Sequence, residues 1–125
     1  MSEQQGKDKL VVIATCGPDD HERSSLAFTM ANAALAMDAV VKVILQADGV
    51  MLARKGTARH VRAPFMTPLA ELLQSFFEQG GQIYACTPCC KARDLTKDDL
   101  LEGTELVTAG FVVDEAMSAK TVFTY

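Results

Sequence analysis

The sequence predicts a single α/β domain in which helices wrap a parallel β-sheet. Apolar segments of strand length alternate with segments of helical period along the whole chain, which is the pattern of strands joined by helical crossovers. The first apolar run, residues 10–14, is continuous, as expected of a strand buried on both faces. A chain of 125 residues is also long enough to bury a core without disulfide support.

The first half of the chain gives two strands and two helical segments. Residues 10–14 and the β-branched run at residues 40–45 are the strands. Asp19 and Glu22 have the spacing of a capping box ahead of a helix over residues 24–37. The expected core face of that helix comprises Leu26, Met30, Ala33 and Met37. After the second strand, Asp48 and Gly49 turn the chain into a short helix over residues 50–55.

The second half continues the alternation. Thr67 is the expected cap of a third helix, with Pro68 at its first position and Gly80 and Gly81 at its end. Its apolar face comprises Leu69, Leu72, Leu73, Phe76 and Phe77. Further strands are expected at residues 82–85, 105–108 and 120–125. Thr87 is the expected cap of a helix that starts at Pro88, Thr96 and Asp99 have the spacing of a capping box ahead of a short helix, and another helix is expected from Val112.

Composition excludes several classes of partner. The net charge of −4 argues against nucleic acid as the main partner, and no apolar run approaches the roughly 18 residues of a membrane span. Residues 1–8 are polar and are expected to form a flexible tail rather than a secretory signal. A cytoplasmic location is therefore expected, where cysteines are reduced and serve catalysis, redox chemistry or metal binding more often than structure.

The cysteines are the strongest functional signal. Cys86, Cys89 and Cys90 lie within five consecutive positions, directly after an apolar strand and around Pro88, which fits the first turn of a helix. A thiol at such a junction faces free backbone N–H groups and the positive end of the helix dipole, so a lowered pKa is expected. Cys86 is the expected nucleophile and Cys89 its partner.

Other candidate residues are weaker. Cys16 ends the first strand and would reach the same sheet edge as Cys86 if their strands are neighbours. For Cys16 and Cys90, the role of a small buried hydrophobe explains the residue as well as a functional thiol does. Lys91 and Arg93 add positive charge that would steady an anionic sulfur. His21 and His60 are expected to be solvated. The basic group Arg54, Lys55, Arg59 and Arg62 is expected to be a solvated face or, alternatively, a loop that binds an acidic partner.

Several segments resemble the DsrE/DsrF-like family. They are the opening at residues 15–20, the helical stretches at residues 25–28 and 31–37, the strand at residues 43–45 with Asp48, Gly49 and Val50, and the motif at residues 86–93. The resemblance implies a three-layer, flavodoxin-like fold that assembles as a homotrimer or homohexamer. It also implies that Cys86 carries sulfur as a persulfide, that Cys89 matches a cysteine found in some members, and that Arg93 matches a commonly basic position. Asp94 replaces a usual glycine, and Cys16 and Cys90 lie outside the common pattern.

The function expected from the resemblance is that of a sulfur carrier, similar to a sulfurtransferase, which takes sulfane sulfur from a donor protein and passes it to an acceptor thiol. Whether this is enzymatic depends on turnover of a small substrate. A dithiol redox protein using Cys86 and Cys89, a cysteine-ligated metal protein and a non-catalytic assembly subunit are the alternatives. No cofactor or metal is expected for the carrier.

Overall fold

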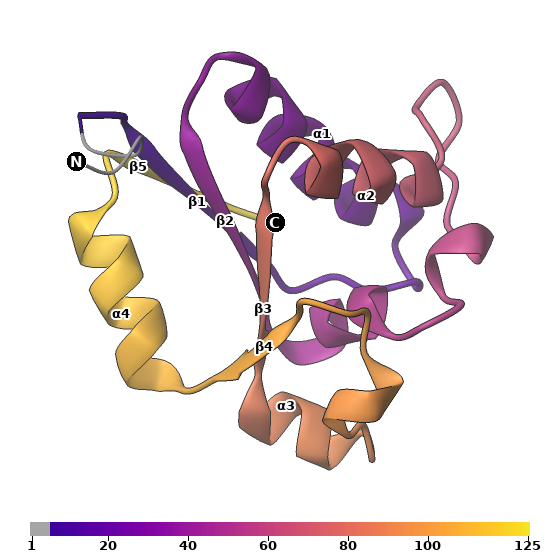
Figure 1. The fold of residues 1–125 in the computed structure, drawn as a ribbon. Helices are drawn as coiled ribbons and strands as arrows, with labels where there is room; N and C mark the ends of the chain where they lie inside the picture. Colours follow the sequence, from indigo (N-terminus) through magenta and orange to yellow (C-terminus); the bar gives the residue numbers. More distant parts are fainter. Residues whose placement is uncertain (1–5) are drawn as a thin grey trace.

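Within residues 6–125, five strands form one sheet, and every pair of neighbouring strands is parallel. The computed structural model describes residues 6–125 (Figure 1). The strands follow the order β4-β3-β2-β1-β5. They are β1 (Lys9–Ala14), β2 (Val40–Leu45), β3 (Gln82–Cys86), β4 (Glu105–Val107) and β5 (Thr121–Thr124). The α/β class and the parallel sheet are confirmed.

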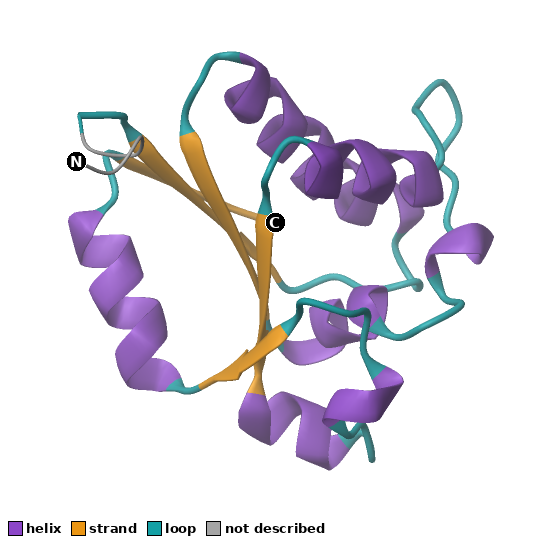
Figure 2. Ribbon diagram, in the orientation of Figure 1, coloured by secondary structure: helices purple, strands orange, loops and turns teal. Residues whose placement is uncertain are grey.

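Helices cover both faces of the sheet, which gives three layers (Figure 2). Helices α1 (His21–Ala36) and α2 (Leu69–Glu78) lie side by side on one face, and α4 (Ala109–Ser118) lies on the other. The short α3 (Thr87–Ala92) extends from the end of β3. Three short 3₁₀ helices complete the connections: η1 (Ala47–Ala53), η2 (Ala58–His60) and η3 (Lys97–Asp99).

The strand order explains this division of the helices. The chain steps from β1 to β2, β3 and β4 in one direction, and then returns across the sheet to place β5 beside β1. Crossovers between parallel strands are right-handed, so connections that run in opposite directions must cover opposite faces. The first three connections accordingly pack on the face of α1 and α2, and the fourth, α4, packs on the other. The switch between faces falls at the neighbouring strands β3 and β4.

The larger core lies between the sheet and the pair α1 and α2. Phe28 of α1 and Phe76 of α2 are fully buried and meet edge to face, with ring centroids 5.4 Å apart. Such an aromatic pair contributes about 1 kcal/mol beyond the area that it buries. The predicted apolar face of α2 is confirmed for Leu69, Leu72 and Leu73 as well, whereas Phe77 is 36 % exposed.

The smaller core, beneath α4, contains a buried carboxylate. Glu115 accepts hydrogen bonds from Lys9 and Lys42, each at 2.7 Å, and its side chain is 10 % exposed. Burial alone would raise the pKa of Glu115, but the hydrogen bonds from Lys42 and Lys9 outweigh it and hold the pKa below its usual range. Tyr84 and Phe111 pack beside this group, with ring centroids 4.6 Å apart. The ion triad therefore fixes α4 to β1 and β2.

The start and the buried face of α1 differ from expectation. Asp20, not Asp19, caps the helix, and its carboxylate accepts the backbone N–H of Arg23 at 2.9 Å. The predicted core face was wrong, because Ala33 and Met37 are exposed. The buried residues of α1 are Ser24, Ser25, Ala27, Phe28, Ala31 and Ala34. Five of these six are small, which lets the helix approach the sheet and α2 closely.

Other boundaries shift by a few residues. Pro68 rather than Thr67 occupies the cap position of α2, and Cys86 rather than Thr87 caps α3, so that Pro88 lies in its second position. The helix expected from Val112 begins at Ala109. The capping box at Thr96 is confirmed, because Thr96 N donates to the carboxylate of Asp99 at 2.8 Å. The last strand is shorter than expected, β5 ending at Thr124.

The amino-terminal segment is described in part. Of the expected tail at residues 1–8, residues 1–5 lie outside the described part of the chain. Lys7 pairs with Asp38 at 2.9 Å, and the carbonyl of Asp8 accepts the N–H of Val40 at 2.8 Å. Among residues 6–125, no helix is long and apolar enough to cross a lipid bilayer.

Candidate functional site

Cys86 lies where β3 ends and α3 begins. It is the last residue of β3, is half-buried, and pairs in register with Val107, the last residue of β4. The hydroxyl of Thr87 donates to the carbonyl of Val107 at 2.9 Å and holds these two strand ends together. Because the crossover connections change faces between β3 and β4, Cys86 occupies the position at which open α/β sheets bind ligands.

Cys89 lies one helical turn further on and is also half-buried. Its sulfur accepts the backbone N–H of Ala47 at 3.3 Å. Ala47 begins η1 and has a φ of 50°, a left-handed conformation that is uncommon for a residue with a side chain. The turn after β2 therefore directs a backbone donor at the sulfur of Cys89.

Arg93 connects α3 to the same turn. Its guanidinium contacts one carboxylate oxygen of Asp48 through Nη2 at 2.8 Å and Nε at 3.2 Å, and Nη1 donates to the carbonyl of Cys89 at 3.0 Å. The side chain of Arg93 is 29 % exposed. This arrangement holds a positive charge at the end of α3, close to both cysteines.

The expected lowering of the pKa of Cys86 was wrong for the resting protein. Burial raises the pKa of the Cys86 thiol above its ordinary value, and the neighbouring Cys89 thiol raises it further. The backbone N–H of Cys89 and the charge of Arg93 act in the opposite direction without reversing the shift. A thiol in an apolar site is expected to stay protonated, because the site solvates the thiolate poorly. Cys86 is therefore a thiol at neutral pH, next to groups that favour an anion.

Cys90 lies near Cys86 and Cys89 but is 1 % exposed and belongs to the main core. Burial, and after it the neighbouring Cys86 and Cys89 thiols, raise the pKa of the Cys90 thiol. Cys16 follows β1, which is separated from β3 by β2, so the two strands are not neighbours. Within residues 6–125, no three side chains of His, Cys, Asp or Glu are arranged to hold a metal ion. The half-buried thiols that the structure brings together are those of Cys86 and Cys89.

The loops after β1 and β2 fit together through glycine. A Cβ atom at Gly17 would lie 2.3 Å from the carbonyl oxygen of Asp48, and one at Gly49 would lie 2.1 Å from that of Ala14. Neither position has room for a side chain. This close approach fixes Asp48, and through it Arg93, relative to the sheet.

Sequence reasoning missed the residues that support the cysteines. Asp48 was expected only to turn the chain, Thr87 only to cap a helix, and no role was expected for Ala47. Asp48 lies 45 positions from Arg93, and a pairing over that separation has no periodic signal. The topology of the sheet could have predicted this pairing: Asp48 follows β2, which lies next to β3, so Asp48 reaches the same sheet edge as the residues that follow β3. His21, expected in solvent, instead contacts the backbone of Arg62 through Nδ1.

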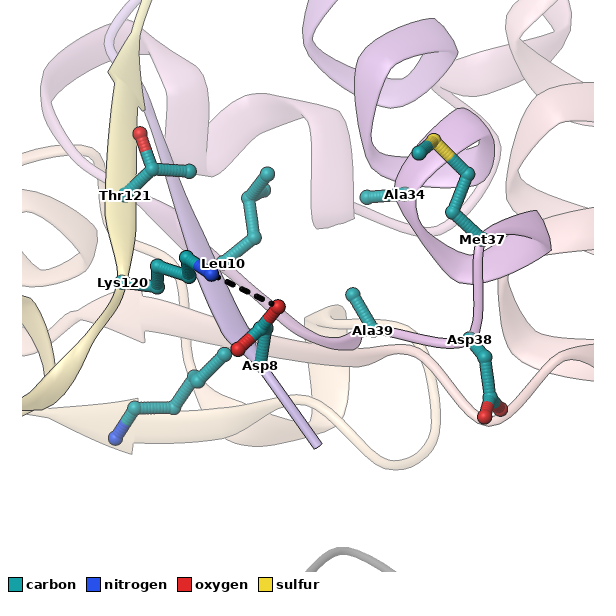
Figure 3. Close-up of a pocket in the computed structure, with 9 residues that line it drawn as sticks. Asp8, Leu10, Ala34, Met37, Asp38, Ala39, Lys120 and Thr121 are labelled. Carbon is teal, nitrogen blue, oxygen red and sulfur yellow. Dashed lines mark hydrogen bonds and ion pairs between the residues drawn. The ribbon is translucent and has the colours of Figure 1, made fainter. Parts of the chain in front are cut away.

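A hollow at the opposite end of the sheet is unrelated to this chemistry. It measures about 230 Å³ and lies where β1 and β5 begin, near the end of α1 (Figure 3). An ion pair of 3.3 Å between Lys120 and Asp8 crosses its rim. Among the described residues, its lining includes neither a cysteine nor a histidine, and Cys86 lies at the other end of its strand.

The fold and the thiol pair at the edge of the sheet define a flavodoxin-like α/β protein with a cysteine site. A family model of the DsrE/DsrF-like family matches residues 8–125, so the chain belongs to that family, which is generally linked to sulfur relay. The uncharacterized protein MK0008 of Methanopyrus kandleri is 38 % identical over 109 residues, which make up 86 % of each chain.

Solved structures agree on the fold. The ychN protein from E. coli superposes with a TM-score of 0.79 at 20 % identity, covering 94 % of this chain and 99 % of that one. The protein MTH1491 from Methanobacterium thermoautotrophicum, whose function is unknown, gives a TM-score of 0.74 at 20 % identity, with coverage of 95 % and 99 %. At such identities the likeness concerns the fold alone.

Proposed function

We propose that the protein is a carrier of sulfane sulfur that holds sulfur as a persulfide on Cys86. The observation that carries the proposal is the placement of Cys86: a half-buried thiol at the carboxyl end of β3, beside Cys89 and within the field of Arg93. Membership in the DsrE/DsrF-like family supports the same function.

Loading is a thiol exchange on sulfur. The Cys86 thiol first loses its proton to solvent, and the thiolate attacks the outer sulfur of a donor persulfide, R–S–S⁻. The new bond joins the Cys86 sulfur to the transferred sulfur, the S–S bond of the donor breaks, and the donor leaves as the thiolate R–S⁻. No net oxidation occurs, because one persulfide replaces another.

The surroundings of Cys86 suit the loaded form better than the resting thiol. A persulfide ionises more readily than a thiol, and its terminal sulfur extends one bond beyond the half-buried Cys86 sulfur. The charge of Arg93 and the N–H of Cys89, which already act to lower the pKa of Cys86, would stabilise that anion. The ion pair with Asp48 keeps the guanidinium in place.

Unloading has two routes. An acceptor thiolate can attack the terminal sulfur, which restores the Cys86 thiolate and leaves the sulfur on the acceptor. Alternatively, the Cys89 thiolate can attack the inner sulfur, which forms a Cys86–Cys89 disulfide and releases HS⁻; a thiol reductant must then reduce the disulfide. The proximity of Cys89 favours this dithiol chemistry as the second candidate function.

Intact-protein mass spectrometry tests the proposal. Reduced wild type, Cys86→Ser and Cys90→Ser are each incubated with glutathione persulfide. We expect the mass of one sulfur atom to be added to wild type and to the buried-cysteine control Cys90→Ser, mapped to Cys86, and to be lost in Cys86→Ser. Loss of two hydrogen masses without added sulfur would instead favour the dithiol function. An adduct that persists in Cys86→Ser would refute the assignment of Cys86.

A further inference from the structure

The sheet edge that carries the cysteines also carries a concentration of positive charge. From Gly49 to Ala70 the sequence contains four arginines or lysines and no aspartate or glutamate, although the whole chain has a net charge of −4. The four are Arg54, Lys55, Arg59 and Arg62, and all are exposed. This segment forms η1, η2 and the loop before α2.

Part of this charge lines a hollow of about 370 Å³, here called the basic groove. Its lining residues are Pro18, Met51, Arg54, Lys55, Gly56, Thr57, Arg59 and His60. None of these described residues is acidic. Two hydrogen bonds hold the wall in place: the backbone N–H of Lys55 donates to the carbonyl of Asp99 at 2.9 Å, and the side-chain Nζ of Lys55 donates to the carbonyl of Asp98 at 2.8 Å.

The basic groove adjoins a second hollow that reaches Arg93, the residue beside Cys89. The second hollow, of about 310 Å³, shares Met51 and Arg54 with the basic groove and is also lined by Arg93. Arg93 in turn donates to the carbonyl of Cys89 at 3.0 Å. The second hollow includes Asp94 and Asp99, which partly compensate Arg54, whereas the described lining of the basic groove contains cationic and no acidic side chains.

We propose that the basic groove docks an acidic segment of the partner protein that exchanges sulfur with Cys86. Glutamate or aspartate side chains would pair with Arg54, Lys55 and Arg59, while the segment passes Arg93 and brings its thiol to Cys86. Charges on the rim of a site act mainly on the rate of encounter and on partner choice. Nucleic acid fits less well, because the chain as a whole carries a net charge of −4.

This inference rests on the proposed function, so its test separates binding from sulfur transfer. The probe is a fluorescein-labelled peptide of alternating glutamate and glycine that ends in serine, which binds without exchanging sulfur. Its binding to the Cys86→Ser protein is measured by fluorescence anisotropy at low and at high salt. The same peptide ending in cysteine then serves as acceptor from the loaded wild type.

The groove variant is Arg54→Ala combined with Arg59→Ala, and the charge-matched control is Lys7→Ala combined with Lys120→Ala at the opposite end of the sheet. We expect the groove variant to weaken binding and slow transfer by about tenfold at low salt, an effect that high salt removes. The control should behave as wild type. Replacing both arginines by lysine should retain binding, which separates charge from folding.

Three results would overturn the inference: equal binding of a lysine peptide, equal losses in the groove and control variants, or tighter binding of a single-stranded oligonucleotide of the same charge. Absence of peptide binding while Cys86 still loads sulfur would refute the groove and leave the carrier function standing. Peptide binding that depends on the groove, in a protein that never loads sulfur on Cys86, would refute the carrier function and the identity of the partner.

Discussion

Replacing Gly49 by alanine should destabilise the protein and disturb the cysteine site together. The added Cβ would lie 2.1 Å from the carbonyl oxygen of Ala14. Non-bonded atoms in contact lie about 3.5 Å apart, so the loops after β1 and β2 would have to separate by roughly 1.4 Å. Overpacking of this kind costs about 1–3 kcal/mol. Because Gly49 follows Asp48 directly, the displacement would also move the carboxylate that holds Arg93.

The assay is urea unfolding of wild type, Gly49→Ala and the matched control Gly110→Ala. Gly110 lies in α4, and a Cβ there meets no atom within 4 Å. We expect the control to gain about 0.4–1 kcal/mol, since alanine reduces the entropy of the unfolded chain and suits a helix. The Gly49 variant should lose about 1–3 kcal/mol and load sulfur more slowly. A Gly49→Ala protein as stable as wild type would show that the two loops do not meet as described.

Three further predictions concern single residues. The alkylation rate of Cys86, followed by peptide mass mapping, should rise with pH, and the midpoint of the rise should lie above the ordinary thiol pKa of about 8.5, because burial raises the pKa of this thiol. The Arg93→Gln variant should move that midpoint to a higher pH, because the charge of Arg93 lowers the pKa of Cys86. An unchanged midpoint would count against a role for Arg93. Asp48→Asn should slow sulfur loading, because Asp48 holds the guanidinium of Arg93 in place. It should change stability by less than about 1 kcal/mol, because this ion pair is exposed. Equal loading rates in the variant and wild type would contradict the role of Asp48 in positioning Arg93. Glu115→Gln should cost about 2–3 kcal/mol, since it leaves two lysine ammonium groups without a carboxylate. The pKa of Glu115 is lower in the folded than in the unfolded protein, so its contribution to stability is fully present above the unfolded pKa of about 4.3 and is lost as pH falls through the folded pKa. Calorimetry should therefore show the stabilities of wild type and Glu115→Gln converging at acid pH. A stability difference that stays constant with pH would argue against the ion triad.

Local patterns in the sequence determined the elements and the place of the thiols. The apolar runs became β1 and β2, and the period of Leu69, Leu72 and Phe76 correctly gave the buried face of α2. The strand that precedes the cysteines placed Cys86 at a sheet edge. Each of these features depends on residues a few positions apart, where backbone geometry and side-chain period act directly.

The tertiary structure decided what depends on segments that are distant in the chain. The buried face of α1 follows small residues, because close packing against the sheet and α2 outweighs the apolar stripe. The pairing of Arg93 with Asp48 and the donor of Ala47 depend on how loops after neighbouring strands meet. The raised pKa of Cys86 follows from burial, which overcomes the effect expected of a helix start. Periodicity reports which side of an element is apolar, whereas packing and desolvation depend on the atoms that the rest of the fold brings to each side.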